Sequence, residues 1–319
     1  MSARSFFLAA ALLSTTFVAF AQETPVVSLK EFVSAEVRGQ GFTLADDAQI
    51  HIYARGGGFR PGRGGMWAYG WILDARTREV VWQMTADNSQ ASTVYRVADQ
   101  YLRLPKGQYE AYFSNYGFGR DLVFMPWIRN VDRRRAPVKG EGFLALSGLD
   151  GRHLWQERAG NYGLEIAVAS GSASSVQTFE APLAWKNVVA SSGACHDGQR
   201  WEQAFTVKKP LTLHIYALGE FSGSTFVDGG WITDTRTQRK VWEMTEAKAQ
   251  YAGGGRKNRR QVETLRLEPG EYVATYVTDG SHSAADWNVA PPCDPFLYGL
   301  TLSVPDDAER SSFVVKETK

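Results

Sequence analysis

The sequence has few cysteines, few histidines and no excess of charge. Its 319 residues include two cysteines and five histidines, with 35 basic against 34 acidic side chains. Such a balance gives no large field of one sign, which argues against nucleic acid or an anionic membrane as the main partner. The histidines and cysteines also lack the tight spacing of a zinc site. The composition therefore predicts a neutral globular protein with no resident cofactor.

Long apolar runs are absent after the first twenty residues. The run at 6–20 follows a single cation, Arg4, and ends in the small-x-small pattern A-F-A. This is the pattern of a secretory signal peptide, and the run is shorter than the ~20 residues that a membrane-spanning helix needs. We expect residues 1–21 to be removed, leaving a periplasmic or secreted protein with no membrane span in the mature chain. The alternative is an uncleaved anchor.

The sequence also lacks any sustained, capped helical period. Instead, LTLHIYA at 211–217 alternates apolar with polar residues, the period of two that is typical of a half-buried strand. Two further segments, ITDTRTQRKVWEM and LRLEPGEYVATYV, have the pattern of hairpins with turns at 235–239 and 269–270. Short strands separated by such turns predict an all-β fold, an antiparallel, jelly-roll-like β-sandwich.

The sequence contains an internal duplication. GWILDARTREVVWQMT from Gly70 recurs as GWITDTRTQRKVWEMT from Gly230, at an offset of 160 residues. The segment HIYA at 51–54 recurs at 214–217, and YLRLPKGQYEAYF recurs as TLRLEPGEYVATY, both at an offset of 163. A period of this length is a whole domain, whereas the repeats of a solenoid are much shorter. We therefore expect two copies of one β-sandwich domain.

The two copies differ in length before their last strand. NYGLEI from position 161 corresponds to LYGLTL from position 297 at an offset of only 136, so the first copy carries about 27 extra residues. We expect the first domain to span 24–180 and to contain this insertion at 128–158. The second domain is expected at 186–305, followed by a C-terminal tail at 306–319.

The order of these motifs resembles a known family. F-T-V, a strand ending in I-Y-A, W-I-x-D-x-x-T, L-x-L-x-P-G-E-Y and a closing Y-G-L-T-L is similar to the bacterial pre-peptidase C-terminal domain. The resemblance covers 42–117 with 160–169, and 205–304. It implies a small β-sandwich that is a noncatalytic accessory module, sometimes calcium-binding, involved in secretion or in binding polymeric substrates. This chain departs from the usual context of that family, because no catalytic domain accompanies the two copies.

The two cysteines and the paired tryptophans are expected to be structural. In an exported chain, Cys195 and Cys293 most simply form one disulfide. Three pairs of tryptophans occupy matching places in the two copies, which favours hairpin or core packing over an exposed platform: Trp71 with Trp231, Trp82 with Trp242, and Trp127 with Trp287.

Two loops are specific to the second copy, and they carry the candidate site. AGGGRKNR at 252–259 has no counterpart in the first copy beyond its last arginine, and TDGSHSAADWN at 278–288 replaces SNYGFGRDLVFMPW. Loops on a rigid sandwich commonly carry binding, so we hypothesise that the two loops meet and form a polar pocket. The candidate ligand-binding residues are Lys257, Asn258, Arg259, Asp279, Ser281, His282, Asp286 and Asn288.

Calcium is a candidate ion for the same region. Asp279, Asp286 and Asp294 can supply the oxygen ligands that calcium prefers, although their spacing matches no calcium-loop signature. The alternative is a structural turn, in which Asp279 and Ser281 bond the backbone. A hydrolytic triad of Ser281 or Ser283 with His282 and Asp279 is not expected, because neighbouring residues of one turn point in different directions.

Together these features predict an exported, non-catalytic binding or accessory protein of the cell envelope. Its candidate polar ligand or cation site lies in the second domain, and its partner would be an envelope protein or a glycan. Two alternatives stay open from the sequence: a structural subunit of an envelope assembly, and a hydrolytic enzyme with an unrecognised site.

Overall fold

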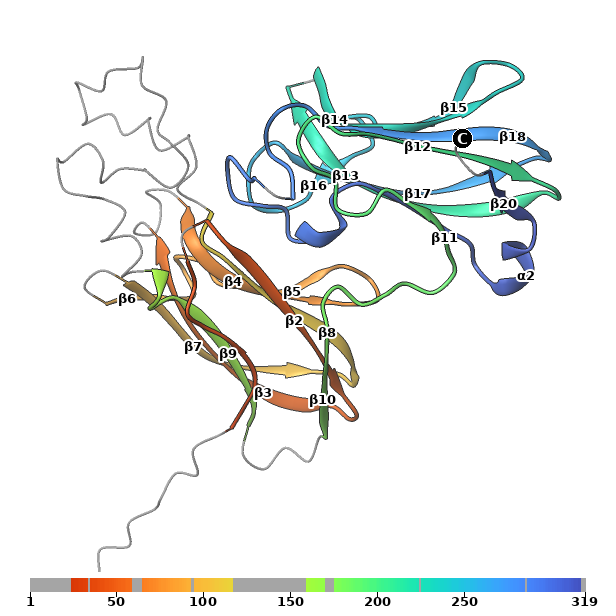
Figure 1. Ribbon diagram of the computed structural model, residues 1–319. Coiled ribbons are helices and arrows are strands. Elements are labelled where there is room, and N and C mark those ends of the chain that lie inside the picture. Colours follow the sequence, from red (N-terminus) through yellow and green to blue (C-terminus); the bar gives the residue numbers. More distant parts are fainter. Residues whose placement is uncertain are drawn as a thin grey trace, which may run out of the picture.

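The chain forms two β domains joined by a short linker (Figure 1). The computed structural model describes residues 24–33, 35–58, 65–92, 95–116, 159–169, 175–223, 225–284 and 286–316. The expected signal peptide, the expected insertion at 128–158 and Trp127 lie outside the described residues. In the part of the chain that the structure describes, no helix has the length and apolar character to cross a membrane.

The first domain is one antiparallel sheet of ten strands folded into two layers. One layer has the order β1-β9-β3-β7-β6, the other has the order β10-β2-β8-β4-β5, and pairing of β3 with β4 joins them. The strands are β1 (Pro25–Leu29), β2 (Val37–Leu44), β3 (Ala48–Gly58), β4 (Met66–Asp74), β5 (Val80–Gln83), β6 (Gln90–Ser92), β7 (Tyr95–Leu104), β8 (Gly107–Ser114), β9 (Gly163–Val168) and β10 (Val176–Phe179).

The second domain repeats this topology strand for strand. Its layers have the orders β11-β19-β13-β17-β16 and β20-β12-β18-β14-β15, again joined through two long strands, β13 and β14. Its elements are β11 (Val188–Ser191), β12 (Arg200–Val207), β13 (Leu211–Ser222), β14 (Thr225–Asp234), β15 (Arg239–Glu243), β16 (Gln250–Tyr251), β17 (Asn258–Leu267), β18 (Gly270–Val277), η4 (Pro295–Leu297), β19 (Leu300–Ser303), α2 (Asp307–Arg310) and β20 (Phe313–Val315). The all-β fold and the internal duplication are therefore confirmed.

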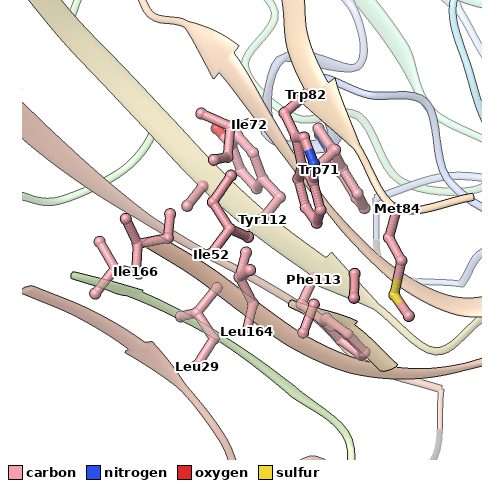
Figure 2. Packing of buried hydrophobic residues seen from close by; sticks show 14 of the residues in the cluster. Leu29, Ile52, Trp71, Ile72, Trp82, Met84, Tyr112, Phe113, Leu164 and Ile166 are labelled. Atoms are coloured by element: carbon pink, nitrogen blue, oxygen red, sulfur yellow. The ribbon is translucent and has the colours of Figure 1, made fainter. Parts of the chain in front are cut away.

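Each sandwich encloses an apolar core. Figure 2 shows part of the first core, where Trp71 and Phe113 pack with Ile52 and Leu164. The alternation predicted at the start of β13 is present, since Leu211 and the two following odd positions are buried and His214 is exposed. From position 215 to Phe221 every residue of β13 is buried, so this strand is covered on both faces. The covered stretch is the part of β13 that lies beside the candidate site.

The repeated tryptophans pack much as the duplication predicts. Trp82 and Trp242 are buried, and their indole N–H groups donate to equivalent partners, Gln100 at 2.9 Å and Glu263 at 2.6 Å. Trp71 is fully buried, but its counterpart Trp231 is only partly buried. This difference arises because the second domain covers the face of the first that carries Trp71.

The predicted disulfide is wrong. Cys195 and Cys293 are both free thiols. The Cys195 sulfur lies 3.2 Å from the Ser192 hydroxyl inside the second domain, whereas Cys293 packs beside Gly253 and against the core of the first domain. A disulfide needs the two sulfurs about 2 Å apart, and these two thiols have different neighbours.

A thiol titration checks this arrangement. The protein, unfolded in guanidinium chloride without any reductant, is expected to give two reactive thiols per chain with a chromogenic disulfide reagent. A titration that finds none, and that recovers two only after reduction, would restore the disulfide.

The two domains meet across a buried ion network centred on Arg78. The guanidinium of Arg78 donates two hydrogen bonds to Glu110 of its own domain, at 2.6 and 2.8 Å. It donates two more to Asp294 of the second domain, at 2.8 and 2.5 Å. All three side chains are buried. Tyr112 donates to Glu110, and Tyr216 donates to Asp294 at 2.8 Å. We call these five residues the Arg78 network.

Further contacts surround this network. The Trp71 indole N–H donates to the carbonyl oxygen of Cys293 at 2.7 Å, and the Tyr112 ring packs against Phe296 with centroids 5.7 Å apart. The linker joins in through the Leu183 N–H, which donates to Glu110 at 2.7 Å. At the rim, Arg260 bonds the Arg78 carbonyl oxygen and Glu79. The segment just before η4 is therefore clamped onto the first domain.

Removing Arg78 tests how strongly the interface couples the domains. Arg78→Met leaves two carboxylates buried without their cation, and we expect it to lower the free energy of unfolding by about 3–5 kcal/mol. The measurement is urea unfolding of the protein at neutral pH.

The duplication supplies a matched control. Gln238 occupies the equivalent position, is exposed, and has the same left-handed backbone, with φ of 58° against 61° at Arg78. Gln238→Met is expected to change stability by less than about 0.5 kcal/mol. Equal effects of the two substitutions would contradict the role given to Arg78.

Candidate functional site

The two loops that are specific to the second copy meet at a buried hydrogen bond. Asn258 begins β17, and His282 lies in the loop after β18. The His282 ring nitrogen Nε2 lies 2.5 Å from the Asn258 oxygen Oδ1, and both side chains are completely buried. This contact joins loop 252–259 to loop 278–288.

The partners of Asn258 determine which tautomer His282 adopts. The Asn258 amide nitrogen donates to the carbonyl oxygens of Gly253, at 2.8 Å, and Ala290, at 3.1 Å. The amide oxygen must therefore face the imidazole, and because it only accepts, Nε2 must carry the proton. The second ring nitrogen of His282, Nδ1, is then an acceptor in the neutral ring.

Burial keeps His282 neutral. Its pKa is lowered to about 3, mainly by desolvation and in addition by the charge of Lys257, while a hydrogen bond to Asn288 opposes the shift by favouring the protonated ring. His282 also has a left-handed backbone, with φ of 71°, a conformation that costs free energy for a residue with a side chain. The rings of His282 and Trp287 pack edge to face with centroids 4.9 Å apart.

Two carboxylates that the sequence analysis missed lie beside these loops. Glu220 and Asp228 are directly opposite each other on β13 and β14, and both are buried. Lys257 pairs with Glu220 at 2.7 Å. Asp228 accepts from the Tyr298 hydroxyl at 2.6 Å and from the Asp279 N–H at 2.7 Å. The Asp279 backbone is thus held by a strand carboxylate.

The environment raises the pKa of both carboxyl groups. Burial is the main cause for Asp228, and it raises that pKa to about 7 against the hydrogen bonds from Tyr298 and Asp279, which lower it. Burial also raises the pKa of Glu220, while Lys257 lowers it. The carboxyl of Asp228 is therefore close to half protonated at neutral pH.

The first copy has no such cluster at the equivalent positions. The pair that corresponds to Glu220 and Asp228 is Gly57 and Ala68, which occupy the same register between β3 and β4. Tyr95 stands where the second copy has Asn258. A comparison of the two copies position by position, at offsets of 160 and 163 residues, was the sequence signal that could have found these carboxylates.

The remaining candidate residues hold their own loops. Arg259 donates to the carbonyl oxygens of Arg256, at 2.6 Å, and Asn258, at 3.0 Å. The exposed carboxylate of Asp279 accepts from the Ser281 N–H at 2.8 Å. Asp286 forms an isolated bridge with Ser283, and it is one of the charges that raise the pKa of Tyr116, which burial mainly brings to about 12. Arg259, Asp279 and Ser281 thus form turns.

The three candidate calcium ligands make different contacts in the structure. Asp294 belongs to the Arg78 network, where Arg78 and Tyr216 occupy its oxygens. Within the described ranges, no three histidine, cysteine, aspartate or glutamate side chains are grouped so that they could hold a metal ion.

Several buried polar atoms of the second loop have no hydrogen-bond partner among the residues that the structure describes. These atoms are His282 Nδ1, Ser283 Oγ, Trp287 Nε1 and Asn288 Oδ1. His282 and Ser283 are fully buried, and Trp287 is 3% exposed. Asn288 bonds the His282 ring when that ring is protonated, so these two side chains face each other. An unpaired buried polar atom costs ~1–3 kcal/mol, and Ser283 and Trp287 lack even such a neighbour. We call these four residues the loop cluster.

Both domains cover the loop cluster. Trp287 packs with Tyr298 and Tyr216 in a small apolar group, and Val37 and Tyr116 of the first domain pack against the same group. Trp185 of the linker joins it, with its ring 5.0 Å from that of Tyr216. The cluster therefore lies where the second domain meets the first.

No protein-family model matches the chain, and no curated protein matches it. The resemblance to the pre-peptidase C-terminal domain is accordingly unconfirmed beyond the duplicated all-β architecture.

The pH dependence of stability tests the environment of Asp228. Its pKa is raised from 3.8 to about 7 on folding, so the folded state holds an extra proton between these values. Stability is then greatest below about pH 4 for this group and falls by about 1.4 kcal/mol per pH unit as the pH rises toward 7. Urea unfolding of the wild type and of Asp228→Asn across this range measures the difference.

The substitution leaves the neighbouring groups in place. Asparagine can accept from the Asp279 N–H and donate to Tyr298, and the opposing contribution of His282, whose folded pKa is lowered, is present in both proteins. The free energy of unfolding of the wild type minus that of Asp228→Asn is expected to fall as the pH rises from about 4 to about 7. Parallel curves would show that Asp228 is solvated in the folded state.

Proposed function

We propose that the protein is an exported, non-catalytic binding or accessory protein of the cell envelope. Its ligand site is the loop cluster of the second domain, beside the Asn258–His282 hydrogen bond. The apolar run at 6–20 supports export, and the resemblance to the pre-peptidase C-terminal domain supports an accessory role.

The observation that carries the proposal is the set of unpartnered polar atoms in the loop cluster. A core selected only for stability would replace such groups by apolar ones. Proteins accept this kind of cost at functional sites, where the groups are needed for a ligand.

The geometry favours binding over catalysis. The only imidazole of the site donates to an asparagine, its pKa is about 3, and it is therefore neither a general base with an orienting acid nor a cation at neutral pH. Asp228 is committed to a hydroxyl and a backbone N–H. These groups suit recognition by hydrogen bonds.

Thermal melting with a ligand panel tests the proposal. The mature protein is melted with chelator, calcium, zinc and a series of glycans, and we expect at least one polar ligand to raise the melting temperature. A ligand at 100 times its dissociation constant stabilises the folded state by about 2.7 kcal/mol. Ser283→Ala is expected to reduce the shift, because it removes one hydrogen bond to the ligand.

Two controls make the result decisive. Ser283→Ala without ligand is expected to melt no lower than the wild type, because it removes an unpaired buried hydroxyl. His214→Gln changes an exposed histidine on β13 and is expected to keep the full shift. A panel that shifts neither the wild type nor His214→Gln contradicts the proposed site.

A further inference from the structure

The segment between the second loop and η4 connects the first domain to the candidate site. We call residues 289–294 the strap. The strap belongs to no strand, and it lies between the first domain and loop 252–259. We infer that docking of the two domains assembles the candidate site, because the docked strap holds the two polar loops together. The inference goes beyond the proposed function, since it concerns these loops with or without a ligand.

One side of the strap is fixed to the first domain. Asp294 accepts two hydrogen bonds from Arg78, and the carbonyl oxygen of Cys293 accepts from the Trp71 indole N–H at 2.7 Å. The Cys293 side chain packs against the core of the first domain. Separation of the domains would remove the paired cation of a buried carboxylate together with this packing. We therefore expect the strap to move when the domains come apart.

The other side of the strap holds loop 252–259. The Ala290 carbonyl oxygen accepts the Gly255 N–H, at 2.8 Å, and the Asn258 side-chain amide, at 3.1 Å. The Cys293 N–H donates to the carbonyl oxygen of position 252 at 2.8 Å. Hydrogen bonds of this kind span about 2.7–3.2 Å between the heavy atoms, so a shift of the strap by roughly one ångström breaks these three contacts.

Consecutive glycines at 253–255 allow the strap to lie this close to the loop. A Cβ atom on Gly254 would lie 1.9 Å from the Pro291 carbonyl oxygen, and one on Gly253 would lie 2.1 Å from the Cys293 sulfur. Both distances are far below van der Waals contact, so a side chain at either position would displace the strap. The glycine run has no counterpart in the first copy. The close approach of the strap therefore explains a feature that is specific to the second copy.

Asn258 connects loop 252–259 to the second loop. Its amide nitrogen is held by the carbonyl oxygens of Gly253 and Ala290, and this directs its amide oxygen onto the ring of His282. When the strap moves, one of the two acceptors is lost and the Asn258 side chain can rotate. His282 then loses the contact that joins the loops, and water reaches its ring. Docking and the state of His282 are therefore coupled, and such coupling acts in both directions.

Two substitutions on opposite sides of the strap test the inference. Arg78→Glu places three carboxylates together in the interface and is expected to separate the domains. Gly254→Ala places a methyl group against the strap and is expected to weaken docking from within the second domain. Docking is measured by hydrogen exchange of the Trp71 indole N–H, and the state of the site by nitrogen-15 NMR of the His282 imidazole between pH 5 and 8.

We expect the two measurements to change together. The Trp71 indole N–H is expected to exchange at least tenfold faster in both variants than in the wild type. The His282 ring, whose pKa is about 3 in the docked protein, is expected to titrate between pH 5 and 8 in Arg78→Glu, because a solvated imidazole has a pKa of about 6.5.

Gly223→Ala is the matched control. Gly223 has a left-handed backbone like that of Gly254, with φ of 61° against 66°, but a Cβ atom there meets no described residue within 4 Å. This variant carries the backbone strain without the contact to the strap, and both measurements are expected to stay at their wild-type values.

Two results would overturn the inference. One is a His282 ring that stays neutral in Arg78→Glu while the Trp71 indole N–H exchanges freely, since the site would then persist without docking. The other is wild-type exchange at Trp71 in Gly254→Ala. The second result decides the question even if Arg78→Glu does not fold or stays docked.

Discussion

The guanidinium of Arg78 is the contact on which the rest of the structure depends. It places one cation between a carboxylate of each domain, in a setting where removing any partner leaves a buried charge uncompensated. Asp294 is held by this contact, and the adjacent Cys293 carbonyl accepts from Trp71. The segment leading into η4 is fixed to the first domain, and through the Ala290 carbonyl it also holds Asn258. The domain interface and the candidate site therefore share one segment of chain.

The two copies have diverged in complementary ways on this common frame. The first copy keeps the docking face, since Arg78, Glu110 and Tyr112 correspond to Gln238, Val273 and Thr275 in the second. The second copy carries the polar cluster, where Glu220 and Asp228 replace a glycine and an alanine on equivalent strands. Duplication thus supplied one scaffold, and divergence gave its two versions different sets of buried polar residues.

The parts of the fold that follow from local pattern could be predicted from the sequence. Strand alternation in β13, the turn at Asp234 and the duplication are all readable within short windows or by direct comparison of the copies. The state of the two cysteines could not be predicted in this way. Whether Cys195 can reach Cys293 depends on how distant loops dock, and Cys293 packs against the other domain. Cys195 instead anchors the site loop through its carbonyl, which accepts from the Ala284 N–H at 3.1 Å. That the two polar loops meet was a hypothesis from the sequence. The buried carboxylates beside them, Glu220 and Asp228, were recognised only from the structure.

The protonation of His282 tests the account most directly, because the neutral Nε2–H ring follows from the Asn258 contact that joins the two polar loops. Nitrogen-15 NMR of the imidazole, assigned by loss of the signal in a His282→Asn variant, reports both ring nitrogens. We predict a protonated Nε2 and an unprotonated Nδ1 throughout the range from pH 5 to 8, since the pKa is about 3. Titration near the ordinary histidine pKa of about 6.5, or a proton on Nδ1, would contradict the account.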